Sequence, residues 1–222
     1  MRDKLIIWGA SGHAKVIADI VKLEDRFELV GFLDNINKNT QGRLLCGLPI
    51  YGGEEQLDNL KQNGVKHLIL GFGNCEARLA LSSLIINMGF SLATAIHPKS
   101  ILAHDIIVGN GVVIAAGAVI NPGAQIGDNA IINTASVIEH GCSIQEGAHI
   151  CPGTCLGGDV IVGRASWIGI GSVVKDHVQI GAGVCIGAGS VVINDIPDEV
   201  VAYGVPAKIV RSNKRDDKTF NF

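Results

Sequence analysis

The sequence predicts a small α/β domain followed by a parallel β-helix. Near the N-terminus a strand, a glycine-rich turn, a helix and a second strand follow one another, which is how a βαβ unit of a parallel sheet begins. From Ile96 to Val192 an aliphatic residue then recurs at every sixth position, seventeen times without a break. We therefore expect the first domain over residues 1–95 and the second over residues 96–210, with a charged tail over 211–222.

The elements of the α/β domain follow from the spacing of its apolar residues. Short apolar runs predict strands over 4–8, 28–33, 65–70 and 90–95, and helical spacing predicts helices over 14–21, 54–64 and 76–88. Gly89 is expected to end the last helix, because glycine is the usual residue just past a helix C-terminus. The stretch 36–53 contains several glycines and a proline, so it is expected to form a loop around a short strand.

The six-residue period fits neither a helix, with its spacing of about 3.6, nor a half-buried strand, with its spacing of 2. It is the period of a hexapeptide solenoid, in which three hexads close one triangular coil of 18 residues. Residues 18 apart then stack at about 4.8 Å, the distance between neighbouring strands. Small or β-branched residues mostly follow each aliphatic residue by four positions, as in Ala118, Ser136 and Thr154.

Composition excludes several classes of function. A net charge of -3 gives no reason to expect a nucleic acid or an anionic membrane surface as partner. The N-terminus does not read as a signal peptide, and no apolar run reaches the 18 or so residues of a membrane span. The six cysteines contain no C-x-x-C pair, which favours reduced thiols and a cytoplasmic location.

The first turn is a candidate anion site. Its backbone N–H groups lie at a helix N-terminus, where a pyrophosphate is favoured, and it consists of Gly9, Ala10, Ser11, Gly12 and His13. Asp34 follows at the end of the second strand, where dinucleotide folds place an acid. The turn lacks the full G-x-G-x-x-G spacing, so a nucleotide-bearing ligand other than NAD fits best; a packing turn without ligand is the alternative. Gly73 and Asn74 end a neighbouring strand and should face the same crevice.

Polar residues interrupt the solenoid at Asn133, His140 and His149. Gly158 lies one coil above His140, so a backbone N–H there can approach a ligand next to an imidazole base. This pair suits acyl transfer, in which the imidazole accepts a proton and the N–H stabilises the oxyanion. The alternative for His140 is a structural role, as a corner residue or a subunit-contact residue. His149 stacks below Trp167 along another column.

Two other chemistries are disfavoured. Some hexapeptide solenoids are carbonic anhydrases with three zinc-binding histidines, but only His140 and His149 lie in the central coils here, so no metal is expected. No Gly-x-Ser-x-Gly motif is present, so direct transfer is favoured over an acyl-enzyme.

Four stretches carry a resemblance to a known family: Gly9–His13, Gly73–Arg78, Ile138–His140 and Gly204–Lys208. Over nearly its whole length the sequence resembles the NeuD/PglD-like hexapeptide acyltransferases. The resemblance implies a small Rossmann-like domain followed by a left-handed β-helix, assembled as a homotrimer with active sites between subunits. Similar members acetylate nucleotide-linked amino sugars with acetyl-CoA, and others are sialic-acid O-acetyltransferases.

The resemblance also implies roles for individual residues. His140 matches the general base, Gly158 the glycine whose amide faces the thioester carbonyl, and His149 a second histidine at the sugar end of the substrate. Gly12, His13 and Asp34 match positions that hold the nucleotide. Ile170 and Ala188 match a column of residues that lines the pantetheine channel. Pro206 and Lys208 belong to a loop that matches the one at the outer end of the coenzyme. Relatives often carry an acid directly after the catalytic histidine, whereas this chain has Gly141.

The resulting hypothesis is a cytoplasmic trimer that transfers acetyl from acetyl-CoA to the 4-amino group of a UDP- or dTDP-linked 4-amino-4,6-dideoxy sugar, for surface glycan biosynthesis. O-acetylation of sialic acid or another sugar is an alternative of the same class. A non-catalytic sugar-nucleotide-binding trimer is an alternative of a different class, and the missing acid after His140 keeps it open.

Overall fold

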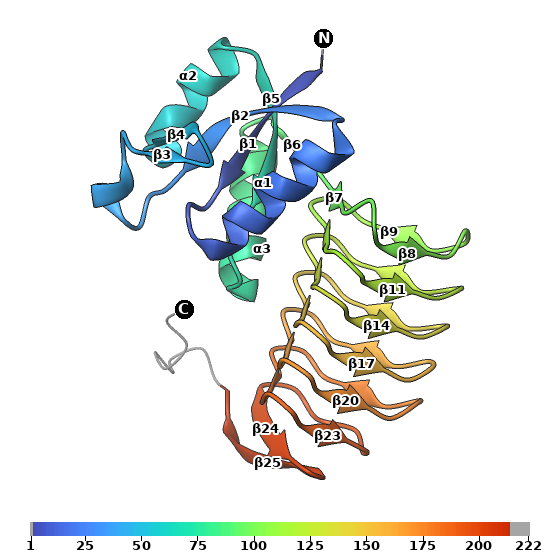
Figure 1. The fold of residues 1–222 in the computed structure, drawn as a ribbon. Helices are drawn as coiled ribbons and strands as arrows, with labels where there is room; N and C mark the ends of the chain where they lie inside the picture. The colour runs from blue at the N-terminus through green and yellow to red at the C-terminus, as the bar shows by residue number, and fades with distance from the viewer. Residues whose placement is uncertain (1, 214–222) are drawn as a thin grey trace.

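The computed structural model describes residues 2–213 as an α/β domain beside a long three-sided solenoid (Figure 1). The α/β domain contains one six-stranded sheet with the order β3-β4-β2-β1-β5-β6. All neighbours pair in parallel except β3 and β4, which form a hairpin. The strands are β1 (Asp3–Trp8), β2 (Phe27–Leu33), β3 (Leu44–Leu45), β4 (Leu48–Tyr51), β5 (Val65–Leu70) and β6 (Ser91–Leu92).

The helices agree with the apolar spacing in the sequence. They are α1 (Gly12–Glu24), α2 (Leu57–Gln62) and α3 (Cys75–Asn87), with two 3-10 turns, η1 (Lys38–Thr40) and η2 (Glu54–Gln56). The helix predicted over 54–64 therefore starts as a 3-10 turn. Gly89 has a φ of 82° just past α3, the left-handed conformation that a helix-ending glycine adopts.

The solenoid consists of three parallel sheets, which are here called face 1, face 2 and face 3. Face 1 contains β7 (Ala95–Ile96), β10 (Val113–Ile114), β13 (Ile131–Ile132), β16 (His149–Ile150), β19 (Trp167–Ile168) and β22 (Cys185–Ile186). Face 2 contains β8 (Ile101–Leu102), β11 (Val119–Ile120), β14 (Val137–Ile138), β17 (Cys155–Leu156), β20 (Val173–Val174) and β23 (Val191–Val192). Face 3 contains β9 (Ile107–Val108), β12 (Gln125–Ile126), β15 (Ser143–Ile144), β18 (Ile161–Val162) and β21 (Gln179–Ile180).

The register of these sheets confirms the coil of 18 residues. Val119 pairs with Val137, and Ile131 pairs with His149, each 18 positions further along the chain. Each two-residue strand ends on one of the periodic aliphatic residues, most of which are buried in one continuous core together with the small residues four positions later. The burial explains why the period is unbroken, since a polar side chain at any of these positions would point into the core.

The strand predicted over 90–95 is wrong as a single element. The chain forms β6, donates one more hydrogen bond from Ala93 N to Leu68 O, and enters the solenoid at Ala95, whose N–H bonds Val112 O. The change of sheet needs a break, because β5 and β10 belong to different sheets. Face 1 lies against α1, whose residues Ile17 and Ala18 share a core cluster with Val113 and Ile131.

The solenoid ends in a hairpin of β24 (Val200–Gly204) and β25 (Ala207–Ser212), which extends face 1. Arg211 and Ser212, at the start of the predicted tail, belong to this hairpin, and 214–222 lie outside the described residues. Within residues 2–213, no helix has both the length and the apolar character needed to cross a bilayer.

Candidate active site

Two loops meet at the carboxyl edge of the sheet, where the sequence predicts a crevice. Gly9 follows β1 and Gly71 follows β5, so the loops lie where the chain turns from one half of the sheet to the other. Gly71 N donates to Trp8 O at 2.7 Å. Gly9 has a φ of 127°, and a Cβ on it would lie only 2.7 Å from Gly71 O. Glycine at position 9 is therefore required both by the backbone conformation and by the contact between the two loops.

The N-terminus of α1 is open toward this crevice. Ser11 is the N-cap residue with an extended backbone, but its hydroxyl makes no capping hydrogen bond. The first turn of α1 contains no acidic residue, and Ser11 and Gly12 are exposed. The free N–H groups and the helix dipole thus leave a favourable place for an anion.

The side chains of Asp34 and Asn74 lie at the same edge of the sheet, but each accepts hydrogen bonds from its own loop or helix terminus. Asp34 Oδ1 accepts hydrogen bonds from the backbone N–H groups of Ile36 and Asn37 at 3.0 and 3.1 Å, and its Oδ2 accepts from Thr40 Oγ1 at 2.9 Å. Asn74 caps α3 by accepting from Ala77 N at 3.0 Å. Both residues shape the loops of the crevice, and their contact with a ligand stays a prediction.

His13 of α1 and His149 of face 1 meet where the two domains join. Their ring centroids are 6.2 Å apart, and the His149 ring packs 4.3 Å from the Trp167 ring. Gly73 lies against the same group, because a Cβ on it would come within 3.2 Å of Trp167 and 3.8 Å of His149 Cε1. The structure thus brings together three predicted substrate-binding residues, Gly73, His13 and His149, from both domains.

The hydrogen-bonding state of His149 follows from Asn133. Asn133 Oδ1 accepts from Thr134 N at 2.8 Å, so its amide nitrogen faces His149 Nε2 at 3.0 Å. Nε2 is therefore the acceptor and Nδ1 carries the hydrogen. His149 Nδ1 and His13 Nε2 are both buried and make no hydrogen bond of good geometry within residues 2–213. A backbone hydrogen bond with Gly73 nevertheless acts on the pKa of His149, in the raising direction, so His13 Nε2 is the atom left for a bound molecule.

Both rings are neutral at pH 7. Burial, with a smaller contribution from the positive charge of Arg78, lowers the pKa of His13 to about 4. Burial also lowers the pKa of His149 well below its usual value, with Arg78 and His13 acting in the same direction. The pair therefore offers hydrogen bonds without adding a charge.

The sequence does not predict a role for Arg78, yet its guanidinium joins the two domains. Only 1% of the residue is exposed. It donates from Nη1 to the carbonyl of Gly73 at 2.5 Å, from Nη2 to Gly147 O at 2.7 Å and from Nε to Asn129 O at 3.2 Å. No periodicity signals this residue, because its acceptors are backbone carbonyls distant in sequence.

His140 and Gly158 meet as the stacking predicts, at the corner between face 2 and face 3. A Cβ on Gly158 would lie 2.5 Å from His140 Cε1 and 2.7 Å from Nε2, so only glycine leaves room for the ring. His140 is exposed, and its ring has no hydrogen bond or ion pair in the described part of the chain. The Gly158 N–H is likewise unpaired there. An imidazole and a free amide N–H therefore belong to neighbouring residues of this corner.

The predicted coenzyme residues lie at another corner, between face 1 and face 2. Ile170 and Ala188 stack one coil apart, with Gly189 N donating to Ile170 O at 2.8 Å, and Ile170 is 59% exposed. Pro206 and Lys208 belong to the terminal hairpin on face 1. Within one chain, His140 and Gly158 are thus separated from these residues by the width of face 2.

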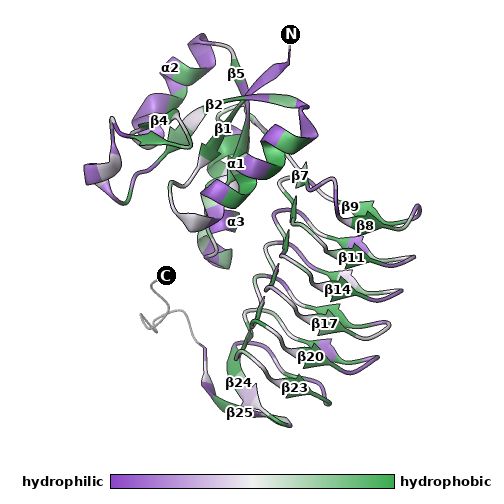
Figure 2. Cartoon of the chain, in the orientation of Figure 1, coloured by the Kyte–Doolittle hydropathy of each residue, from purple (hydrophilic) through white to green (hydrophobic). Residues whose placement is uncertain are grey.

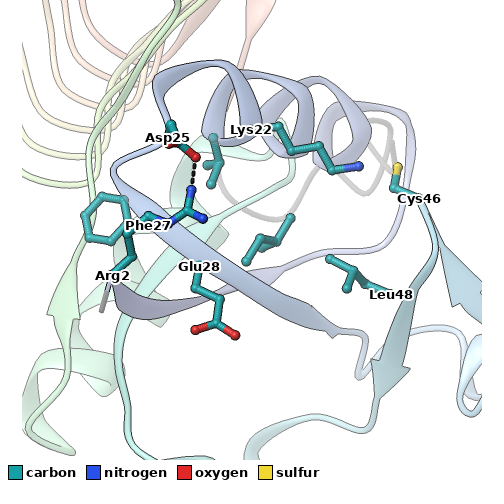
Figure 3. Close-up of a pocket in the computed structure, with 9 residues that line it drawn as sticks. Arg2, Lys22, Asp25, Phe27, Glu28, Cys46 and Leu48 are labelled. Atoms are coloured by element: carbon teal, nitrogen blue, oxygen red, sulfur yellow. Dashed lines mark ion pairs between the residues drawn. The ribbon is translucent and has the colours of Figure 1, made fainter.

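A cavity of about 280 Å³ lies elsewhere on the α/β domain, at the amino-terminal ends of β1 and β2 (Figure 3). Arg2 and Asp25 form an ion pair at its rim. It contains none of the predicted site residues and is on the edge of the sheet opposite Gly9. Across the described residues, no three His, Cys, Asp or Glu side chains are grouped to hold a metal ion.

Comparison with known proteins agrees with this geometry. Residues 4–85 match the PglD N-terminal domain, and residues 159–194 match the bacterial transferase hexapeptide repeat. Perosamine N-acetyltransferase from Caulobacter crescentus, solved as a histidine-to-asparagine variant with CoA and GDP-perosamine, is 35% identical over 94% of this chain and 97% of its own, with a TM-score of 0.87. The chain belongs to the PglD-like family of hexapeptide-repeat sugar acyltransferases.

Two further solved structures extend the comparison. The acetyltransferase domain of PglB from Neisseria gonorrhoeae, in complex with acetyl coenzyme A, is 34% identical over 95% of this chain and 100% of its own, with a TM-score of 0.88. WeeI from Acinetobacter baumannii, at 23% identity over 93% of this chain and 99% of its own, shares the fold with a TM-score of 0.84. PglD-like proteins thus share both domains of this chain in the same order.

Proposed function

We propose that this protein transfers the acetyl group of acetyl-CoA to the amino group of a nucleoside-diphosphate-linked 4-amino-4,6-dideoxy sugar. The proximity of the His140 ring to Gly158, whose N–H donates no hydrogen bond within the described residues, carries the proposal, because the two residues supply the groups that acyl transfer needs. The crevice of Gly9 and Gly71, with an open helix N-terminus, supports a diphosphate-bearing acceptor. The 35% identical relative contains CoA and GDP-perosamine, which supports the class of both substrates and adds GDP to the candidate nucleotides.

The reaction proceeds by direct attack. The sugar amine attacks the thioester carbonyl while His140 accepts the proton that the nitrogen loses. The Gly158 N–H donates a hydrogen bond to the oxyanion of the tetrahedral intermediate. The intermediate collapses by breaking its carbon–sulfur bond, and the proton leaves with the sulfur as CoA thiol.

A panel of acceptors tests this proposal. We expect thiol release from acetyl-CoA with one of GDP-perosamine or the UDP- and dTDP-linked 4-amino-4,6-dideoxy sugars, because a primary amine and a nucleotide are both required. Release of CoA is followed with a thiol reagent, and the product by mass spectrometry. Release with free sialic acid alone would instead indicate O-acetylation. Nucleotide-sugar binding without release by any acceptor would indicate a non-catalytic binding protein.

We also propose a homotrimer in which neighbouring chains complete each site. His140 and Gly158 occupy one corner of the solenoid, whereas Ile170 and Ala188 lie at the corner between face 1 and face 2, and the His13–His149 pair lies between α1 and face 1. The strands of face 2 are coloured as hydrophobic in Figure 2, and the first residue of each strand is apolar, namely Ile101, Val119, Val137, Cys155, Val173 and Val191. Ile101 is 65% and Val173 46% exposed in the single chain. A second copy covers such a row of apolar residues and brings the two corners together.

A charge on face 2 tests the trimer. Val173→Glu is expected to shift the molar mass measured by light scattering from trimer toward monomer, because an unpaired carboxylate would be buried in the interface. Activity is expected to fall with the trimer while circular dichroism stays unchanged. Gln179→Glu, an outward position on face 3, is the matched control. A wild-type protein that is monomeric at assay concentration would contradict the proposal.

We further infer a cytoplasmic location and a part in surface glycan biosynthesis. All six cysteines are free, which suits a reducing compartment. Cell fractionation followed by immunoblotting tests the location, and a membrane or extracellular fraction would contradict it.

A further inference from the structure

Arg78 is a buried cation without an acid beside it. In the described part of the chain its guanidinium forms no ion pair, and Glu76 of the same helix turn pairs with Arg164 instead, at 3.6 Å. Burial lowers the pKa of Arg78, and the side chains that act in the opposite direction are the thiols of Cys75 and Cys151 rather than carboxylates. Backbone carbonyls satisfy its hydrogen bonds, but dipoles do not neutralise a charge. A buried charge without a counter-charge is costly, so one positive charge is left for a bound anion to balance.

The same guanidinium fixes the direction of two peptide groups in the loop after β5. Arg78 Nη1 donates to Phe72 O at 3.3 Å and to Gly73 O at 2.5 Å. The two peptide bonds that contain these carbonyls are trans, and in a trans peptide the N–H points away from the C=O. Because both carbonyls face Arg78, the N–H groups of Gly73 and Asn74 point to the other side of the loop.

These two N–H groups are free to bind a ligand. Neither of them donates a hydrogen bond to any residue that the structure describes. Their loop lies against the one that precedes α1, since a Cβ on Gly9 would come within 2.7 Å of Gly71 O. Successive backbone N–H groups that point to one side form an anion-binding nest. The open N-terminus of α1 offers further donors on the neighbouring loop.

We propose that Arg78 is a positioning residue for the diphosphate of the acceptor. It holds the carbonyls of Phe72 and Gly73 on one side of the loop, so that the N–H groups of Gly73 and Asn74 bind phosphate oxygens on the other side. Its positive charge balances the phosphates from behind the loop. The guanidinium itself does not touch the ligand, because backbone carbonyls occupy it. This role rests on the proposed function, in which the acceptor carries a diphosphate.

Binding measured with and without the phosphates separates this role from a purely structural one. GDP, UDP and dTDP are titrated into the intact protein by calorimetry, and the tightest of them is compared with its nucleoside by displacement. Arg78→Met is expected to weaken binding of the diphosphate by about 10- to 100-fold, the usual worth of one hydrogen bond to a charged group, and to leave the Kd of the nucleoside unchanged. An equal loss for both ligands overturns the proposal, because it indicates a loop that is displaced as a whole.

Lys66→Met is the control for net charge. Lys66 is an exposed cation near the start of β5, at the end of the strand opposite the loop of Gly73. The variant removes the same charge from the domain and should keep the preference for the diphosphate over the nucleoside. The same loss of preference in Lys66→Met and Arg78→Met would show that only the total charge matters, which overturns the proposal.

A proline at position 74 tests one of the two N–H groups without any change to Arg78. Asn74 has a φ of -62°, close to the value that a proline ring imposes. Asn74→Pro and Asn74→Ala both lose the helix cap on Ala77 N, but only the alanine variant keeps the N–H at position 74. We expect the Kd of the diphosphate to be about 10-fold higher in Asn74→Pro than in Asn74→Ala. Equal values overturn the proposal, whatever the stability of Arg78→Met.

These measurements separate the role of Arg78 from the proposed function. If no acceptor in the panel releases CoA while Arg78→Met loses only the diphosphate preference, the proposed reaction fails and the role of Arg78 stands. If an acceptor is acetylated but GDP, UDP and dTDP bind no better than their nucleosides, the reaction stands and the role of Arg78 is overturned.

Discussion

Replacing His140 by alanine is expected to lower kcat by about 10²–10⁴-fold, the usual worth of a general base. The ring stands against Gly158 and has no other partner in the described residues, so its removal disturbs no structural contact besides that one. Binding of coenzyme A should stay intact, because the residues predicted to hold it lie at the other edge of face 2. Turnover with acetyl-CoA and titration calorimetry with CoA measure the two effects separately.

His104 provides a control for this substitution. It is an exposed histidine of the same corner column, two coils below His140, and no glycine–imidazole contact forms there. His104→Ala should therefore retain wild-type kcat. A wild-type rate in His140→Ala would rule out the role of His140 as base, and the same loss in both variants would point to a disturbed corner instead.

Replacing Arg78 by methionine is expected to destabilise the protein by about 3 kcal/mol or more, because it leaves buried carbonyls of Gly73, Gly147 and Asn129 without their donor. For a chain of this size, the loss corresponds to a fall in Tm of roughly 6–12 °C. The loop of Gly73 also loses its tie to the solenoid, so KM for the nucleotide sugar should rise. Differential scanning calorimetry and steady-state kinetics measure these changes.

Removing this cation also changes the histidine pair in a defined direction. Arg78 is one of the causes that lower the pKa values of His13 and His149, so both values should rise in Arg78→Met, although burial remains the larger cause. Arg78→Lys keeps the charge and loses the planar fork, so it should preserve the low pKa values and lose part of the stability. Arg43→Met, an exposed arginine of the same domain, is the control. A Tm equal to that of Arg43→Met would show that Arg78 does not hold the domains together.

The sequence predicted the solenoid and the stacking at its His140 corner with little loss. Each coil pairs with the next through backbone hydrogen bonds at a fixed offset of 18, so a position in the sequence is also a position in space. That is why spacing alone places Gly158 above His140 and Trp167 beside His149. The crevice of Gly9 and Gly71 follows similarly, because the ends of neighbouring parallel strands must meet.

The junction between the domains, in contrast, was decided by the tertiary structure. The strand predicted over 90–95 divides between two sheets, and Arg78 finds its acceptors on loops distant in sequence, where no period relates donor to acceptor. The position of Asp159 over Gly141 depends on which way a side chain turns at a corner, and spacing does not specify that. The sequence by itself thus determined the repeat, the fold class and the stacking of Gly158 on His140, since the hydrogen-bond ladder converts spacing into stacking. How the domains join, and which carboxylate lies over Gly141, depended on side-chain contacts that only the folded chain brings together.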